Sequence, residues 1–135
     1  MRSFALALIF TLSACTTGYG PATDSVSGDL ARAFDIAPDQ IVFAARALHD
    51  DGTVRTIYNL PPGGMFVQTE TFVGFAEWID DSYLVTWRLP YSEIESVRMR
   101  KSTAFLETAS GYETFSLASG RRDTQEKADE ILARR

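Results

Sequence analysis

The chain has 135 residues, a formal net charge of −5 and 45% hydrophobic residues. This length fits one domain that buries a substantial core, while the acidic balance gives no electrostatic basis for binding nucleic acid. No segment after the N-terminal residues is apolar over the roughly 20 residues that a membrane-spanning helix needs, and the single cysteine, Cys15, excludes an intramolecular disulfide.

The N-terminus has the layout of a secretory signal, with Arg2 followed by an apolar run over residues 4–12. This run is about half the length of a spanning helix. It ends in Leu12-Ser13-Ala14-Cys15, which resembles the lipobox of bacterial lipoproteins. The resemblance implies removal of residues 1–14 and attachment of lipid to the thiol of Cys15, the side chain nucleophilic enough to take it.

A lipid on Cys15 predicts a protein held at a membrane of the bacterial cell envelope and facing the periplasm. By resemblance to lipoproteins, Thr16 in place of an Asp favours the outer membrane over the inner one. Residues 15–28 are rich in Thr, Ser and Gly and are expected to form a flexible tether. Residues 29–135 are then expected to form a single domain.

The first half of this domain predicts one short helix and then strands. Residues 29–37 predict the helix, which ends before Pro38. A strand over 40–47, a turn at Asp50-Asp51-Gly52 and a strand over 53–58 have the pattern of a hairpin. The long apolar run 65–78 is either one strand bent at Gly74 or a pair of strands.

The second half predicts further strands and one helix. After a turn at Asp80-Asp81-Ser82, a strand is predicted in which Tyr83, Val85, Trp87 and Leu89 alternate with Leu84, Thr86 and Arg88. Short strands follow at 94–101, 104–108 and 113–117. Residues 123–134 predict a helix capped by Asp123 and Glu126, with an apolar stripe made by Ala128, Ile131 and Leu132.

Two stretches resemble passages of bacterial PH-like and GRAM-like domains: residues 64–75 (GMFVQTETFVGF) and residues 89–97 (LPYSEIESV). The resemblance implies a mainly β (α+β) fold, a PH-like sandwich or partly open barrel of six to seven antiparallel strands closed by a C-terminal amphipathic helix. Relatives that bind phosphoinositides place basic residues between the first strands, where this chain has Asp50, Asp51 and a single Arg55. The fold hosts many unrelated binding roles, so it does not by itself give the function.

The sequence gives no basis for catalysis or for a bound metal. His49 is the only histidine, and it precedes Asp50 without a nucleophile at a recognisable spacing, so we interpret it as a polar residue at the end of a strand. One His without clustered partners lacks the ligands that zinc needs. The acidic residues near one hairpin match no calcium loop and are interpreted as solvated charges: Glu70, Glu77, Asp80 and Asp81. No cofactor is expected.

Two surface features are candidates for binding. The first is the loop Pro61, Pro62, Gly63, Gly64 and Met65, which would be a docking tip if Met65 were exposed, although we favour its burial at the start of a strand. The second is a basic cluster at Arg98, Arg100 and Lys101, to which 121–122 and 134–135 are candidate neighbours. It is either a patch facing an anionic membrane or the outward face of a strand.

The sequence therefore predicts a monomeric, non-catalytic, membrane-anchored lipoprotein whose PH-like domain binds an envelope protein. The contact would use a sheet edge, the Pro-Gly loop or the groove beside the C-terminal helix. One alternative is a periplasmic carrier that encloses a small apolar ligand or a lipid. The other is an enzyme of unrecognised type.

Overall fold

The computed structural model describes residues 26–50 and 63–135. Its seven strands form one antiparallel sheet in the order β4-β3-β2-β1-β7-β6-β5. The strands are β1 (Phe43–Leu48), β2 (Gly63–Gln68), β3 (Phe72–Ile79), β4 (Ser82–Pro90), β5 (Ser96–Arg100), β6 (Thr103–Thr108) and β7 (Gly111–Leu117). The helices are α1 (Val26–Phe34) and α2 (Arg121–Arg134), with short 3-10 helices η1 (Pro38–Gln40) and η2 (Tyr91–Glu93).

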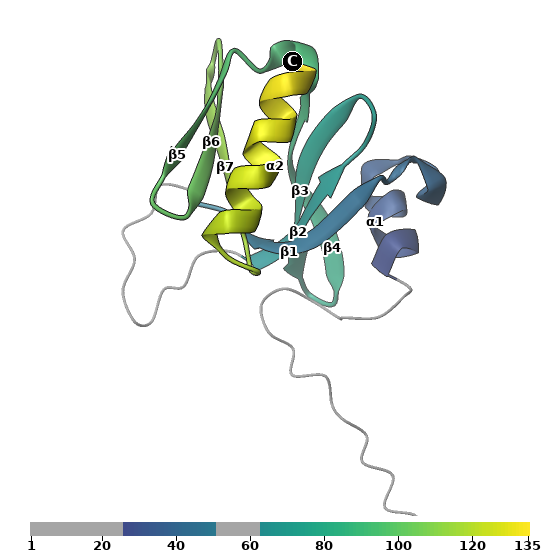
Figure 1. Ribbon diagram of the computed structural model, residues 1–135. Coiled ribbons are helices and arrows are strands. Elements are labelled where there is room, and N and C mark those ends of the chain that lie inside the picture. The colour runs from purple at the N-terminus through teal and green to yellow at the C-terminus, as the bar shows by residue number, and fades with distance from the viewer. Residues whose placement is uncertain (1–25, 51–62) are drawn as a thin grey trace, which may run out of the picture.

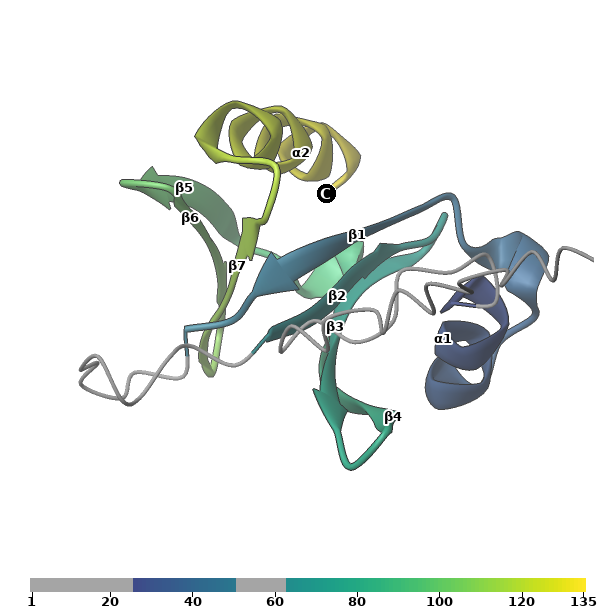
Figure 2. The ribbon, with the colours of Figure 1, turned by 90° about the horizontal axis from the view of Figure 1, so that it is seen from below.

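The predicted fold class is confirmed: antiparallel strands are closed by a C-terminal helix. The sheet bends so that β5, β6 and β7 stand across the direction of β1, and α2 lies over the bend (Figure 1). Seen from below, α2 and α1 lie at different ends of the domain, with α1 beside β4 (Figure 2). This is the architecture that the PH-like resemblance implies.

The main core lies between the sheet and α2 and is largely aromatic. Phe66, Phe75 and Phe115 are fully buried there, and the rings of Phe66 and Phe115 stack with centroids 4.3 Å apart. From α2, Ala128 and Ile131 close this cluster. Burial of large aromatic side chains stabilises the fold in the absence of any disulfide.

A second core cluster lies on the other side of the sheet, beneath α1. Leu30 and Phe34 pack there against strand residues that include Val67. The helix begins at Val26, which is only 9% exposed in this cluster, so the tether predicted over 15–28 ends earlier than expected. The predicted end near residue 37 is also too late, because Asp35 adopts φ +56° and ends the helix.

A β-bulge in the β3–β4 pairing divides β4 between the two clusters. The register shifts between Phe75 and Ala76, so that Trp87 pairs with Phe75 but Val85 pairs with Ala76. Trp87 consequently joins the main core, whereas Val85 packs in the cluster under α1. The predicted alternation is confirmed, since Tyr83, Val85, Trp87 and Leu89 are each more buried than the residues between them. The bulge nevertheless divides these four side chains between the two faces of the sheet, because an extra residue in one strand reverses the direction of the side chains beyond it.

The run 65–78 is a pair of strands, the second of the two predicted arrangements, with a turn at Thr69 between β2 and β3. Gly74 lies within β3, one residue before the bulge. It lies under Phe34, whose ring would be 2.5 Å from a Cβ at this position. The absent side chain thus lets α1 pack directly on the sheet.

Helix α2 begins at Arg121, two residues before the predicted start. Its N-cap is Gly120 without a side-chain hydrogen bond, so the predicted capping pair of Asp123 and Glu126 does not form. Instead the buried Thr124 hydroxyl donates to the Gly120 carbonyl at 3.0 Å and accepts the Leu117 N–H at 2.9 Å. The predicted stripe is also wrong at Leu132, which is 42% exposed.

The remaining strands agree with the prediction to within a few residues. The segment predicted as a strand over 53–58 lies outside the described residues, as do the N-terminal signal, Cys15, and Pro61 with Pro62. Among residues 26–50 and 63–135, no helix is long and apolar enough to cross a bilayer.

Candidate functional site

The most distinctive surface feature is an open strand edge beside α2. All six residues of β1 pair with β2, but only Ala47 and Leu48 pair with β7. The cause is that β7 ends at Leu117, where the chain turns through Gly120 into α2. Within the described residues, the first half of β1 therefore lacks a strand on its β7 side.

A groove of about 430 Å³ lies between this edge and α2. We call it the α2 groove. Its apolar side is made by Phe43, Ala45 and Leu117. Its polar side comes from Ser119 and four charged residues of the helix: Asp123, Glu126, Lys127 and Glu130.

Lys127 fixes the helix to the sheet across the end of this groove. Its side chain is only 10% exposed, and its ammonium lies 2.8 Å from both Gln68 Oε1 and Glu130 Oε2. The same ammonium lies 3.8 Å from the centre of the Phe43 ring, a cation–π distance. Lys127 is thus committed to contacts within the protein.

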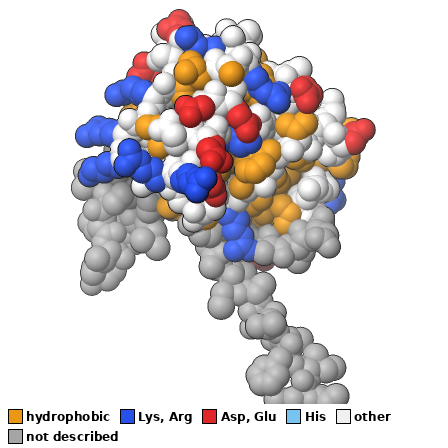
Figure 3. Space-filling view, in the orientation of Figure 1, with side chains coloured by type: hydrophobic (Ala, Val, Ile, Leu, Met, Phe, Trp, Pro, Cys, Tyr) orange, Lys and Arg blue, Asp and Glu red, His pale blue; other side chains and the backbone are white. Residues whose placement is uncertain are grey.

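The charge of the α2 groove is negative. Three carboxylates and one ammonium give a net charge of −2, and Lys127 already pairs with Glu130. The hydrogen bond from Lys127 holds the pKa of the Glu130 carboxyl below its ordinary value. Asp123 and Glu126 are exposed, and Glu126 has a long ion pair of 3.5 Å with Arg122. In Figure 3 acidic side chains, in red, lie over α2 with hydrophobic side chains beside them.

The predicted basic cluster is exposed, and one of its two candidate pairs of neighbours lies near it. The β5–β6 turn lies beside the end of β7, since the Ser116 hydroxyl donates to the Ser102 carbonyl at 2.9 Å, and β7 leads through Gly120 into the start of α2. This brings together what we call the basic patch: Arg98, Arg100, Lys101, Arg121 and Arg122. In Figure 3 blue side chains gather over the β5–β6 hairpin and the start of α2, on the left of the view.

Part of the basic patch is neutralised and part is not. Arg98 pairs with Glu107, and the hydrogen bonds of Glu107 with Ser96 and then Arg98 lower the pKa of its carboxyl. By contrast, Arg100 and Lys101 form no ion pair with another described residue. Lys101 adopts φ +55°, a left-handed conformation that costs an L-residue about 1 kcal/mol.

The C-terminal arginines, predicted as candidate neighbours of the basic patch, lie at the other end of α2. Arg134 forms an ion pair of 3.3 Å with Glu70, and Arg135 donates to the Glu95 carbonyl. The two ends of a helix of this length are about 20 Å apart. Both arginines therefore anchor the helix end and do not extend the patch.

His49 is buried at the end of β1, as interpreted from the sequence. Its Nδ1 lies 3.3 Å from the Thr114 carbonyl, and its ring lies 5.5 Å from that of Phe75. The Thr114 hydroxyl accepts the Asp50 N–H at 2.9 Å and donates to the Asp50 carbonyl at 3.1 Å. These contacts join the end of β1 to β7, which is a structural role.

The acidic residues predicted near one hairpin do not form a cluster. Glu70 lies in the β2–β3 turn, whereas Asp80 and Asp81 lie at the other end of β3, in the β3–β4 turn. Among the described residues, no three His, Cys, Asp or Glu side chains gather as they would around a metal ion.

The part of the Pro-Gly loop that the structure describes is buried. Gly63 and Gly64 begin β2, and Met65 is 7% exposed in the cluster under α1. Met65 therefore lies in the strand position that we favoured and presents no docking tip.

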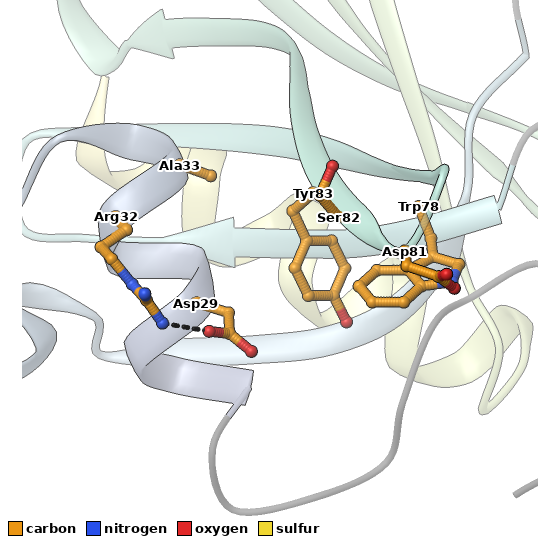
Figure 4. Close-up of a pocket in the computed structure, with 7 residues that line it drawn as sticks. All are labelled: Asp29, Arg32, Ala33, Trp78, Asp81, Ser82 and Tyr83. Atoms are coloured by element: carbon orange, nitrogen blue, oxygen red, sulfur yellow. Dashed lines mark hydrogen bonds and ion pairs between the residues drawn. The ribbon is translucent and has the colours of Figure 1, made fainter.

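A second hollow, of about 360 Å³, lies between α1 and the β3–β4 turn (Figure 4). The rings of Trp78 and Tyr83 meet edge to face there, with centroids 4.8 Å apart. Burial, and then the nearby Asp29, raise the pKa of Tyr83, whose hydroxyl has no hydrogen-bond partner among the described residues. Sequence reasoning missed this hollow, because the bulge in β4 brings Tyr83 to the α1 side.

Comparisons with known proteins concern the fold. No protein-family model and no curated protein sequence matches the chain. The C-terminal domain of an unknown protein from Leishmania infantum is similar in structure, with a TM-score of 0.58 at 13% identity over 79% of this chain and 98% of that domain. The Slm1 PH domain, solved in complex with phosphoserine, has a TM-score of 0.49 at 16% identity over 70% of this chain and 94% of its own.

Proposed function

We propose that this protein is a non-catalytic binding domain, held at a bacterial membrane by lipid on Cys15, whose α2 groove takes up an envelope partner. The single observation that supports the proposal most is the open edge of β1 beside α2. A strand edge with unpaired backbone groups is a ready template for another chain. The described residues also contain a buried histidine engaged in structural contacts and no gathered set of metal ligands.

The proposed anchor derives from the sequence Leu12-Ser13-Ala14-Cys15. Eleven peptide units separate Cys15 from Val26 and reach about 38 Å when fully extended. A domain of this size is roughly 35 Å across. The chain length therefore allows any side of the domain to approach the membrane surface.

The arrangement favours one side. Three features lie on the lower side of the domain in Figure 1: the start of α1, where the tether joins, the β5–β6 turn and the first turn of α2. The last two carry the basic patch. We propose that this side faces the anionic headgroups of the membrane, since each cation near such a surface is favourable by about 1 kcal/mol. The α2 groove then remains open to a partner beside the membrane.

The interior of the domain gives less support to the alternative that the protein carries an enclosed apolar ligand. The space between the sheet and α2 is occupied by buried side chains of the main core, including Phe66, Phe115 and Ile131. An enclosed apolar ligand would have to displace these aromatic contacts. A surface groove requires no such displacement.

Photo-crosslinking in intact cells tests the proposal. With a probe at Ser119, which is exposed and lines the α2 groove, we expect one dominant adduct with an envelope protein. A matched probe at Ala109, exposed in the β6–β7 turn, should give no such adduct. The adduct should also disappear in the double variant Asp123→Asn/Glu126→Gln.

Recovery of the protein from membranes with lipid on Cys15, measured by mass spectrometry of its N-terminal peptide, checks the anchor separately. Equal adducts at Ser119 and Ala109, or lipid adducts alone, would contradict the binding role of the groove.

A further inference from the structure

We infer that the ligand of the α2 groove is an extended polypeptide segment that carries Lys or Arg at alternate positions and binds as an added strand on β1. The inference rests on the proposed function and names the chemistry of the partner. Three features of the groove support it: its backbone, its side chains and its charge.

The backbone of β1 can pair with an added strand on its β7 side. Residues Phe43 to Ala45 pair with β2 on one side, and on the other side the pairing with β7 begins only at Ala47. The Ala118 N–H still donates to the Arg46 carbonyl at 2.8 Å, after which the chain leaves the sheet. An added segment of about four residues would continue the line of β7 and satisfy the edge groups over about 13 Å.

The side chains of the groove fit alternate long residues. In a strand added to β1, every second side chain would point to the α2 side of the sheet, as those of Phe43 and Ala45 do. Such a side chain would pass over Leu117 and end near Asp123 or Glu126. A Lys or Arg satisfies both demands, because its aliphatic stem covers apolar surface while its charged end stays at the polar rim.

The negative charge of the α2 groove favours a segment that carries Lys or Arg over one that carries Asp or Glu. The cation of the groove, Lys127, is held by Gln68, Glu130 and the Phe43 ring, so it cannot turn to meet an incoming carboxylate without losing these contacts. Asp123 and Glu126 stay exposed at the rim. A segment bearing Asp or Glu would meet like charge, which opposes binding.

The test uses the whole chain, extracted from membranes in detergent micelles, and a dye-labelled octapeptide of alternating Thr and Lys, read by fluorescence anisotropy. We expect a dissociation constant on the order of 100 μM, since the contact is short. An octapeptide of alternating Thr and Glu should bind at least tenfold more weakly. The variant Asp123→Asn/Glu126→Gln should weaken binding of the Thr-Lys peptide at least fivefold.

Two controls separate strand addition from general attraction of charges. A Thr-Lys peptide with N-methyl groups on alternate residues keeps its charge but loses backbone donors, and it should not bind measurably. The variant Asp39→Asn/Glu93→Gln removes two exposed carboxylates outside the α2 groove and should leave binding unchanged.

Equal binding of the N-methylated peptide, equal binding of the Glu peptide, or no binding of either unmodified peptide would overturn the inference. These outcomes are distinct from failure of the proposed function. An adduct at Ser119 in cells without peptide binding would keep the groove as a site for a partner of another kind. Loss of that adduct as well would remove the proposed function itself.

Discussion

At the scale of single residues, the packing of the sheet requires that Gly64 has no side chain. This residue lies between Ala47 of β1 and Glu77 of β3. A Cβ at this position would lie 2.0 Å from the Ala76 carbonyl oxygen, and backbone atoms cannot move away as a flexible side chain would. Gly64 therefore permits the close approach of β2 to β3 at this position.

We expect Gly64→Ala to lower the free energy of unfolding by at least about 2 kcal/mol, because the clash forces the backbone apart. Gly28→Ala is a matched control, since a Cβ there meets nothing within 4 Å and the residue lies in α1. It should raise stability by about 0.5–1 kcal/mol. Urea unfolding followed by circular dichroism measures both changes, and equal effects would contradict the steric argument.

The sequence predicts the burial of a side chain correctly where burial follows the spacing of apolar residues along a helix. It fails where burial depends on contacts with residues far away in the sequence. Ala128 and Ile131 are buried as their spacing predicts. Lys127 was missed because its burial depends on Gln68 and Phe43, which lie far away in sequence. No local pattern distinguishes such a lysine from a solvated one.

At the scale of elements, the start of α2 is connected to the sheet by a side chain inside the first turn of the helix. Thr124 receives the Leu117 N–H and donates to the Gly120 carbonyl, so it joins the end of β7 to the helix. Sequence reasoning identified a capping pair at Asp123 and Glu126 and placed the helix start two residues late. The Gly120 turn, at φ +118°, begins the helix without a polar cap.

We expect Thr124→Val to cost about 1–3 kcal/mol of stability, since the shape is kept but a buried N–H loses its acceptor. Hydrogen exchange at the Leu117 amide should accelerate more than exchange in the middle of α2. Thr124→Ser keeps the hydroxyl and should preserve the protection of that amide. If valine left the Leu117 amide as protected as threonine does, the hydroxyl would have no such role.

The bulge in β4 is a second element that sequence reasoning missed. The alternation from Tyr83 to Leu89 is regular in the sequence, and only the pairing with β3 reveals the extra residue. The consequence for the candidate sites is direct, because Tyr83 turns to the hollow beside α1 and away from the main core.

At the scale of the whole molecule, the basic patch gives a domain with an uneven distribution of charge. The chain is acidic overall, yet one side of the domain presents five arginine and lysine side chains against two carboxylate partners, Glu107 and Glu126. The α2 groove is negative along the same helix. The proposed orientation follows from this distribution together with the position of the tether.

The orientation can be measured with the natural lysines, since the chain has only two, Lys101 and Lys127. Lys101 is exposed and Lys127 is buried, so acylation by an amine-specific reagent reports mainly on Lys101. On vesicles of phosphatidylcholine with 30% phosphatidylglycerol we expect acylation of Lys101 to be several-fold slower than on phosphatidylcholine alone. The protection should vanish in 1 M salt, where charges are screened within about 3 Å.

Arg100→Gln/Arg121→Gln should also remove this protection, whereas Arg134→Gln/Arg135→Gln, at the far end of α2, should not. Equal acylation rates on both kinds of vesicle would contradict the orientation. If Cys15 carries no lipid, the protein can be attached to the vesicles through its thiol, so that the orientation is tested independently of the anchor.

The strand order also has a consequence for how the domain assembles. Strands β4 and β5 follow each other in the chain but occupy the two outer edges of the sheet. The strands therefore form two consecutive meanders, β1–β4 and β5–β7. Among the described residues, their backbones are joined in the sheet by the two pairs between β1 and β7 and by the adjacent hydrogen bond from the Ala118 N–H to the Arg46 carbonyl. Because contacts between near neighbours in sequence form fastest, we expect each meander to fold from its own hairpins and the β1–β7 seam to close last. In a nascent chain, the first meander can thus acquire its pairing before the residues that complete the main core have left the ribosome.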